Sequence, residues 1–259
     1  MTKEQGLGPA FDAPGLRVER HDTVTSTNTL AFERARGGDP GGLWIVGQEQ
    51  TQGRGRRGRH WFSGRGNLYA SLLLIDPEPA QRIAELPLLA AVALSEAIDA
   101  ACGTHKLARL KWPNDLLVDG AKVSGILLEA ENLGDERQAV VLGFGVNVAV
   151  HPADGLYPCT GLSALGYRSD PDSVFQHLAG ALSLWLGIWA KPDGFAHVRT
   201  AWLSRAAHLG QQITVQNGSR EVTGVFRDLD DQGHLVLQPA DGGLMTIYAG
   251  DVFLPGSQR

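Results

Sequence analysis

The pattern of the chain changes after Leu209, and this change limits the fold more than any other feature of the sequence. From there onward, short segments rich in β-branched residues alternate with tight-turn pairs such as Asn217-Gly218. Short strands joined by tight turns at short intervals are typical of a small β-barrel. The sequence therefore predicts three segments, which are a flexible tail (residues 1–15), an α/β domain (16–208) and a β-barrel (209–259).

The segment before Leu209 mixes strand patterns with helical patterns. Alternating or continuous apolar residues predict strands over residues 16–22, 43–48, 68–75, 107–132 and 138–150, the fourth of these being divided by tight turns. Apolar residues with a helical period predict helices over residues 26–36, 79–102, 171–190 and 195–208. We therefore expect an α/β (α+β) domain in which helices flank a mixed β-sheet.

Composition argues against several classes of protein. The net charge of -5 disfavours a protein whose whole surface binds nucleic acid. No apolar run is long enough to span a membrane, and the first residues lack the apolar core of a secretion signal. The two cysteines, Cys102 and Cys159, form no CxxC pair, so we expect reduced, buried thiols. Together these features predict a cytoplasmic protein without a membrane partner.

Residues 53–59, with the sequence GRGRRGR, place four arginines and three glycines in one polar loop. The arginines repel one another and the glycines lose conformational entropy on ordering, so this arginine loop needs a compensating anion. Guanidinium groups and backbone N–H groups both bind phosphate or carboxylate oxygens. Taken alone, the composition of the arginine loop is as compatible with a solvated basic segment or an arm that binds nucleic acid as it is with a loop that closes on an anion. It does not match the GxxxxGK phosphate-binding loop.

Five short motifs follow one another in an order and at spacings that resemble the catalytic domain of biotin protein ligases. They are Ser26-Thr27-Asn28, the arginine loop followed by Trp61, KWPND at 111–115, KVSGILLE at 122–129 and GFGVNV at 143–148. Each motif alone has an ordinary structural explanation, such as a lysine beside a core indole, a hairpin residue or glycines that permit close strand packing. The resemblance covers residues 16–259 and includes the small C-terminal SH3-like barrel of that family.

The resemblance implies a two-step reaction. Biotin and ATP form biotinyl-5′-AMP and pyrophosphate, and the biotinyl group is then transferred to a lysine of a biotin carboxyl carrier protein domain. The use of ATP also implies Mg²⁺, with Asp115 as the carboxylate assigned to it. Some relatives carry an N-terminal DNA-binding domain, but the predicted tail is too short for one, so we expect no DNA binding. The residues are compatible with a monomer and with a homodimer through exposed strand edges.

The resemblance also assigns roles to individual residues. The catalytic residues are Arg56, Lys111 and Lys122. The biotin-binding residues are Ser26, Thr27, Asn28, Gln50, Arg54, Gly55, Arg56 and Lys122. The nucleotide-binding residues are Arg56, Arg59, Trp61, Lys111, Asn114 and Asn147, and Tyr157 is a candidate for stacking on adenine. The cationic members of this set offset the repulsion between a carboxylate and a triphosphate.

Two alternatives remain at the level of sequence. A lipoate ligase or octanoyl transferase has a related scaffold, although the arginine loop with KWPND is characteristic of the biotin group. A non-enzymatic module that binds nucleic acid through the arginine loop would lose affinity steeply with salt and would not turn over ATP. The acidic overall charge disfavours this second alternative.

Overall fold

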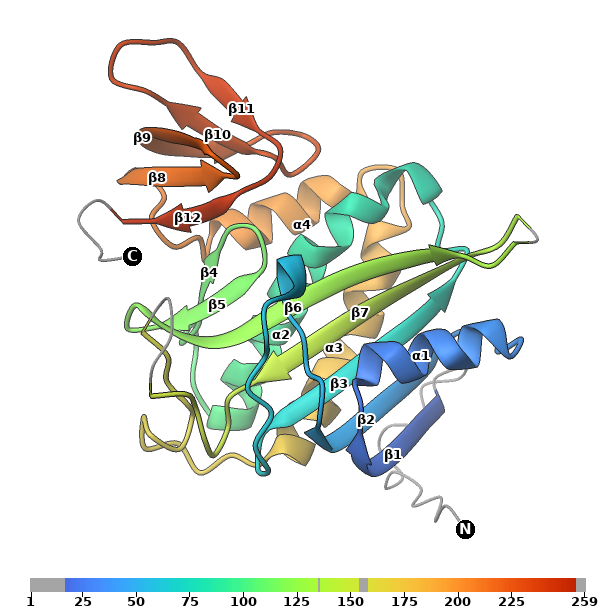
Figure 1. Cartoon of the computed structure of the whole chain (residues 1–259). Helices are drawn as coiled ribbons and strands as arrows, with labels where there is room; N and C mark the ends of the chain where they lie inside the picture. The colour runs from blue at the N-terminus through green and yellow to red at the C-terminus, as the bar shows by residue number, and fades with distance from the viewer. Residues whose placement is uncertain (1–16, 135, 154–157, 255–259) are drawn as a thin grey trace.

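A seven-stranded mixed β-sheet forms the centre of the larger domain in the computed structural model of the chain (Figure 1). The structure describes residues 17–134, 136–153 and 158–254, so the tail expected over residues 1–15 lies outside the described residues. The strand order is β1-β2-β3-β7-β6-β5-β4, with β1 parallel to β2 and the other neighbours antiparallel. The bounds are β1 (Arg17–Val24), β2 (Leu43–Gln50), β3 (Leu68–Ile75), β4 (Arg109–Lys111), β5 (Asp115–Val118), β6 (Ala121–Asn132) and β7 (Gln138–Val146).

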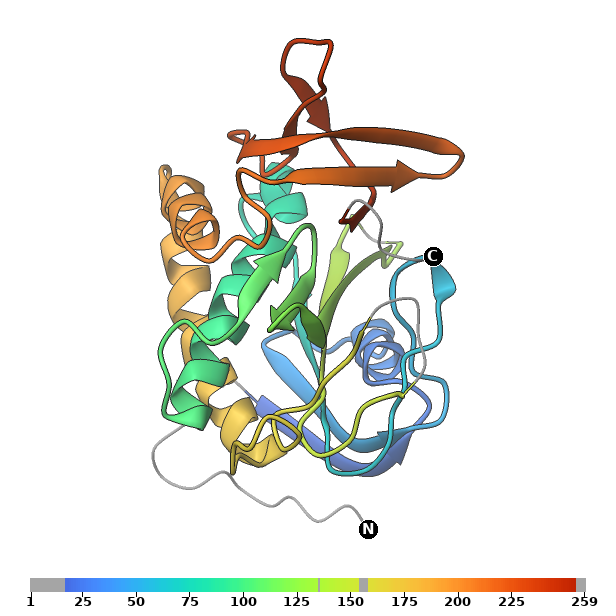
Figure 2. The same ribbon diagram turned by 90° about the vertical axis from the view of Figure 1, so that its left-hand side faces the viewer.

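Helices cover both faces of this sheet (Figure 2). Their bounds are α1 (Thr27–Arg36), α2 (Leu86–Cys102), α3 (Pro171–Trp189) and α4 (Gly194–Leu203). Helices α2 and α3 pack on one face, whereas α1 and the loop between β2 and β3 lie on the other. The expected mixed sheet flanked by helices is therefore confirmed.

Strand β7 is buried on both faces, and this accounts for the apolar residues at nearly every position of residues 138–150. Leu142 faces the α2 and α3 side and belongs to the main core, whereas Val141 lies on the opposite side in the smaller core beneath α1. Gly143 and Gly145 continue the α1 side of the strand, because successive side chains alternate between the faces of a sheet. Glycine at these two positions leaves room for the side chains of Asn28 and Trp61 to approach the middle of the sheet.

One predicted helix is divided in the structure. Residues 79–102 form a 3₁₀ helix, η2 (Ala80–Glu85), followed by α2. Pro87 occupies the first turn of α2, where its missing N–H would have no partner within the helix and where its fixed backbone angle suits a helix start. The helix expected to run to residue 208 also ends early, at Leu203.

The early end of α4 has a clear cause, because the chain turns to pair with β4. The N–H of Leu110 donates to the carbonyl of Arg205 at 2.9 Å, and the N–H of Ala207 donates to the carbonyl of Leu110 at 2.7 Å. This pairing satisfies backbone groups of β4 that its neighbour β5 does not reach. Cys102 and Cys159 form no disulfide bond, as expected, but both are partly exposed rather than buried.

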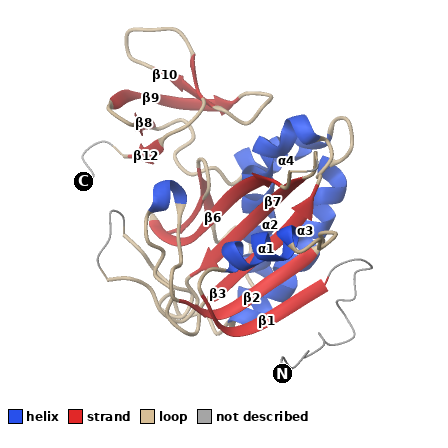
Figure 3. Ribbon diagram, turned by 45° about the vertical axis from the view of Figure 1, so that its right-hand side comes forward, coloured by secondary structure: helices blue, strands red, loops and turns tan. Residues whose placement is uncertain are grey.

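The C-terminal domain is a five-stranded antiparallel sheet in the order β11-β10-β9-β8-β12, and it lies beyond one edge of the larger domain (Figure 3). The bounds are β8 (Gln212–Asn217), β9 (Arg220–Leu229), β10 (Leu235–Gln238), β11 (Met245–Ile247) and β12 (Asp251–Phe253). Trp202 of α4 packs against Phe226 of β9 with ring centroids 6.4 Å apart, which joins the two cores. Among the described residues, no helix is long and apolar enough to span a membrane.

We expect Trp189→Ala to lower the free energy of unfolding by about 3–5 kcal/mol, because this large core side chain leaves a cavity when it is truncated. Trp189 is 1% exposed, and its indole N–H donates to Glu85 Oε2 at 2.7 Å. Urea denaturation of purified protein measures the change. Leu184→Ala on the same helix is the control, since Leu184 is 63% exposed and its loss should change stability by less than about 0.5 kcal/mol.

Candidate active site

One cavity of about 360 Å³ is lined by every residue that the sequence assigned to the site and that the structure describes. It lies on the α1 side of the sheet and is bounded by the arginine loop and by β12 of the C-terminal domain. The predicted residues that line it are Ser26, Thr27, Asn28, Gln50, Arg54, Gly55, Arg56, Arg59, Trp61, Lys111, Asn114, Asp115, Lys122 and Asn147. Segments far apart in the sequence therefore converge on one place.

Glycines of β6 and β7 form the floor of the cavity. Gly125 and Gly145 are register partners on adjacent strands, and the Trp61 ring lies directly against both. A Cβ at Gly143 would collide with the side-chain amide of Asn28. The glycines thus permit a close approach that any larger residue would block, which is a reason for glycine in a strand interior.

The N-terminal end of α1 forms one end of the cavity. Ser26 is the N-cap residue of α1, but its side chain makes no capping hydrogen bond with the described residues. Gln50 Oε1 instead accepts from the backbone N–H of Thr27 at 2.9 Å. Ser71 Oγ lies 2.7 Å from Thr27 Oγ1 and 2.6 Å from Asn28 Oδ1. A rigid set of donors and acceptors, beside the positive end of a helix, suits a polar ligand with carbonyl or N–H groups.

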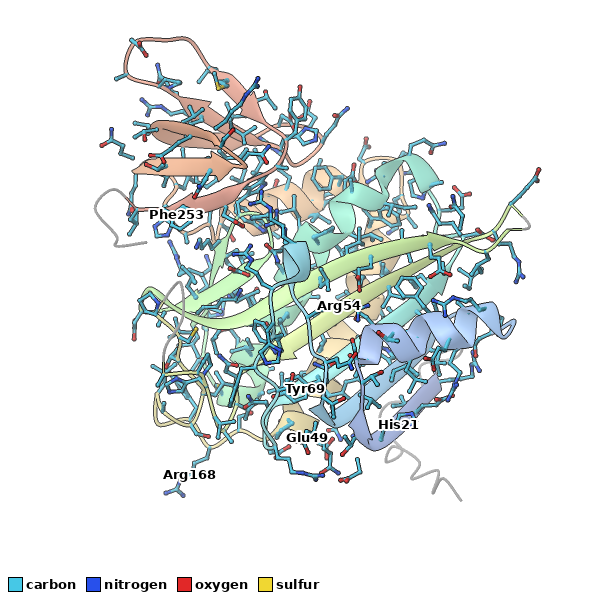
Figure 4. All side chains as sticks on the ribbon, in the orientation of Figure 1. His21, Glu49, Arg54, Tyr69, Arg168 and Phe253 are labelled. Atoms are coloured by element: carbon cyan, nitrogen blue, oxygen red, sulfur yellow. The ribbon has the colours of Figure 1, made fainter. Side chains whose placement is uncertain are left out.

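Arg54 begins the arginine loop and is held by Glu129 of β6. Its guanidinium donates to both carboxylate oxygens of Glu129, at 3.1 and 2.9 Å, and to Thr29 Oγ1 at 2.7 Å. Asn28 Nδ2 also donates to Glu129, at 2.7 Å. Figure 4 shows Arg54 beside α1 in front of the sheet. A two-point guanidinium–carboxylate contact is geometrically specific, so Arg54 fixes the start of the loop.

Asp251 of β12 receives the other three arginines of the loop. Arg59 Nη2 lies 3.0 and 3.1 Å from its two carboxylate oxygens, and Arg57 Nη1 lies 3.1 Å from one of them. Arg56 is more distant, at 3.6 Å, and donates to Asn114 Oδ1 at 3.0 Å and to the carbonyl of Gly250. The arginine loop was expected to need a compensating anion. Asp251 supplies part of that negative charge from within the protein.

Two lysines occupy the wall between the arginine loop and the hairpin of β5 and β6. Lys122 Nζ pairs with Asp115 Oδ1 at 2.7 Å and lies 5.3 Å from the centre of the Trp61 ring. Lys111 is 8% exposed, and its Nζ lies 5.9 Å from the centre of the Phe253 ring. Burial lowers the pKa of the Lys111 ammonium, and burial likewise lowers the pKa of Arg56. Burial of cations at one wall makes them responsive to an incoming anion.

The two asparagines brace the backbone around the cavity. Asn114 Nδ2 donates to the carbonyl of Ile126 at 2.6 Å while its oxygen accepts from Arg56. Asn147 is 2% exposed, and its side chain donates to the carbonyl of Thr160 at 3.1 Å. Asn147 thus has a structural partner in addition to its place in the cavity wall. Tyr157, the candidate for adenine stacking, lies outside the described residues.

Sequence reasoning missed several residues that organise the site. Glu129 was part of a recognised motif but received no role, and Asp251 and Ser71 were not identified. The need for counter-ions to the arginine loop indicates that carboxylates lie near it, but it does not indicate which ones. Their pairing with particular arginines depends on tertiary contacts between segments that are 75 and 192 residues apart.

Comparison with known proteins identifies the family. Residues 21–147 match the model of the biotin/lipoate A/B protein ligase family, and residues 208–254 match the biotin protein ligase C-terminal domain. A biotin–[acetyl-CoA-carboxylase] ligase of Paracoccus denitrificans is 40% identical over 89% of this chain and 98% of its own length. This chain belongs to the biotin protein ligase family.

Other relatives agree with this assignment. The bifunctional ligase/repressor BirA of Bacillus subtilis is 34% identical over 96% of the chain and 77% of its own length. Among solved structures, the biotin protein ligase of Aquifex aeolicus in complex with biotin and ATP is 28% identical, with a TM-score of 0.78 over 92% of this chain and 97% of that one. Membership of the biotin protein ligase family thus extends across both domains of the chain.

We expect Lys111→Met to stabilise the folded protein at pH 7 by about 1 kcal/mol, because a buried ammonium is exchanged for an apolar chain of similar length. Burial lowers the pKa of Lys111 below its ordinary value of 10.5, so its charged form is disfavoured in the folded state. That penalty is complete below the lowered pKa and fades as the pH rises toward 10.5. Urea denaturation at pH 7 and at higher pH measures the difference. A gain that grows with pH would contradict this explanation.

Proposed function

We propose that this chain activates biotin with ATP and transfers it to a lysine of an acceptor domain, as expected of a biotin protein ligase. The observation that carries this proposal is the convergence of Arg56, Lys111 and Lys122 on a cavity whose other end is the polar start of α1. The bicyclic ring of biotin, its carboxylate and the triphosphate of ATP would lie in that order along the cavity, from the start of α1 to the cationic end. The named activities of the Paracoccus and Aquifex relatives support the same reaction.

In the first step, a carboxylate oxygen of biotin attacks the α-phosphorus of ATP. A new O–P bond forms, the bond to the bridging oxygen of the β-phosphate breaks, and pyrophosphate leaves. Both reactants are anions, so cations at the point of attack lower the barrier. We assign this task to Arg56, whose guanidinium can contact two phosphate oxygens, and to Lys122, which supplies a compact positive charge near the carboxylate.

Lys111 and Arg59 stand nearer the C-terminal domain and are assigned to the leaving pyrophosphate. Lys111 lies against Phe253 of β12, and Arg59 lies on Asp251 of the same strand. Trp61, Asn114 and Asn147 complete the nucleotide side of the cavity. Positive groups in a cavity that is shielded from water act more strongly than they would in solvent.

In the second step, the neutral amine of an acceptor lysine attacks the acyl carbon of biotinyl-5′-AMP. A C–N bond forms, the bond between the acyl carbon and the phosphate oxygen breaks, and AMP leaves while the amine loses a proton. The name of the Paracoccus relative gives acetyl-CoA carboxylase as the protein that it acts on. By analogy, we propose that the acceptor of this chain is a biotin carboxyl carrier protein domain. The arginine loop excludes water from the reactive anhydride until the acceptor arrives.

The ring of biotin is assigned to the start of α1. Ser26, Thr27 and Gln50 present hydroxyl and amide groups that match the carbonyl and N–H groups of a ureido ring. Asn28, Arg54 and Gly55 close this end of the cavity. A site that hydrogen-bonds particular polar groups rejects ligands that lack them, and lipoate has no ureido group.

Mg²⁺ is expected to arrive with ATP. No group of three or more histidine, cysteine, aspartate or glutamate side chains among the described residues could hold a metal ion by itself. Mg²⁺ commonly binds one or two carboxylates together with substrate phosphates, and Asp115 offers one carboxylate in the cavity. When bound, the ion would neutralise charge on the phosphates, while Asp115 also orients Lys122.

Oligomeric state and DNA binding are further proposals. Strand β1 has a free edge in the order of described strands, and a homodimer could form there by strand pairing. Sedimentation analysis tests this. We also propose that the chain does not bind operator DNA, which a gel-shift titration with duplex DNA tests. Steep, salt-dependent binding together with a lack of ATP turnover would favour the nucleic-acid-binding alternative.

We expect biotin, and not lipoate, to support pyrophosphate release from ATP in the presence of Mg²⁺. The variants Arg56→Ala and Lys122→Ala should each lower this rate or the retention of the adenylate by about 100-fold, because each removes a charge that stabilises the transition state. A coupled pyrophosphate assay and filter binding of the adenylate measure these effects. Arg220→Ala is the control, since Arg220 is an exposed arginine of the C-terminal domain. Equal release with lipoate, or unchanged variants, would contradict the assignment.

We expect Asp115→Asn to raise the Mg²⁺ concentration for half-maximal activity by about tenfold, because the loss of one carboxylate weakens the site by about 1.4 kcal/mol. Titration of Mg²⁺ at fixed ATP measures this value. An unchanged Mg²⁺ dependence with a lower maximal rate would show that Asp115 acts through Lys122 alone.

A further inference from the structure

The C-terminal domain contributes one carboxylate to the cavity, and that carboxylate meets three guanidinium groups. Asp251 is the first residue of β12, and its side chain is 15% exposed. Arg57 and Arg59 lie on it at 3.1 and 3.0 Å, whereas Arg56 lies at 3.6 Å. Three positive charges surround one negative charge, and two of them, Arg56 and Arg59, line the cavity together with Asp251.

The contacts divide the arginines into two groups. Arg57 and Arg59 have short contacts to Asp251, as expected of arginines that hold a loop in place. Arg56 has its longer contact to Asp251 and divides its hydrogen bonds between Asn114 and the carbonyl of Gly250. Arg56 is therefore the arginine of this group that Asp251 holds least closely, and its side chain lines the cavity.

The backbone at Arg57 also needs external support. Its φ of +57° lies in the left-handed region, which is unfavourable for a residue with a side chain. The adjacent Gly58 has a φ of +70° and can adopt such an angle without a penalty. Arg57 remains in this conformation while its guanidinium contacts Asp251 and Asn217 of the C-terminal domain.

Asp251 is itself held in place by the sheet of the C-terminal domain. It is the register partner of Gln216 on β8. The domain is fixed to the larger one by the Trp112 indole, which donates to the carbonyl of Gly233 at 3.1 Å. Phe253, two residues along β12, lies against Lys111. The backbone that carries this carboxylate is thus held by contacts that do not involve the arginine loop.

We infer that Asp251 is a positioning residue for the biotin protein ligase reaction, which assembles the arginine loop before ATP binds. It holds Arg57 and Arg59, and it thereby presents Arg56 to the α-phosphate. The inference rests on the proposed function for its catalytic consequence but not for its structural one. Without Asp251, the loop would have to order as ATP binds, and the cost of ordering would reduce the affinity for ATP.

Trypsin measures the structural consequence directly, because it cleaves after arginine in mobile segments. In the ligand-free full chain, Asp251→Asn should be cleaved within residues 54–59 about tenfold faster than the wild type, with an unchanged melting temperature. Asp251→Glu, which keeps the carboxylate, should restore most of the protection. The matched control is Asp241→Asn, which makes the same charge change at an exposed position of the same domain.

Steady-state kinetics measures the catalytic consequence. Asp251→Asn should raise KM for ATP by about tenfold, should leave KM for biotin within about twofold, and should release more biotinyl-5′-AMP into solution. Unchanged loop cleavage, or cleavage that rises throughout the chain with a lower melting temperature, would overturn the inference. A lower KM for ATP would also overturn it, because Asp251 would then compete with phosphate. Wild-type protein without biotin-dependent turnover would refute the proposed function and leave the cleavage result interpretable.

Discussion

Electrostatic repulsion within the arginine loop is the constraint on which the rest of the site depends. Four guanidinium groups on a glycine-rich backbone do not form an ordered structure unless negative charge is placed among them. Two carboxylates from different elements provide it, Glu129 at the start of the loop and Asp251 at its far end. Neither removes the whole positive charge, so the cavity remains electropositive and suited to a carboxylate and a triphosphate.

Side chains of β7 alternate between the two faces of the sheet, and this alternation places the cavity on one face and the main core on the other. One side of the strand builds the main core against α2 and α3, and the other side begins as core beneath α1 and then becomes glycine. The same strand thus builds the core on one face and, on the other, a glycine surface that forms part of the cavity floor. Stability and function are separated by side-chain alternation, so a core variant such as Trp189→Ala and a site variant such as Arg56→Ala should affect different properties.

Much of the fold could be predicted from sequence because its determinants are local. Apolar patterns located the strands and helices, and the change after Leu209 located the all-β C-terminal sheet. The predicted end of α4 was wrong, because the chain after this helix turns to pair with Leu110, and this is a contact between distant segments. In the site, motifs identified the residues that line the cavity, but Asp251 carries no local signal. Its part in the site arises from the docking of one domain on the other.

The most direct measurement of the central claim is a crystal structure of this chain with a non-hydrolysable analogue of biotinyl-5′-AMP. We expect the phosphate mimic to lie between Arg56 and Lys122, with the ureido ring at the start of α1 and with Arg57 and Arg59 still on Asp251. An analogue bound elsewhere, or one bound here with Arg56 and Lys122 turned into solvent, would contradict the account.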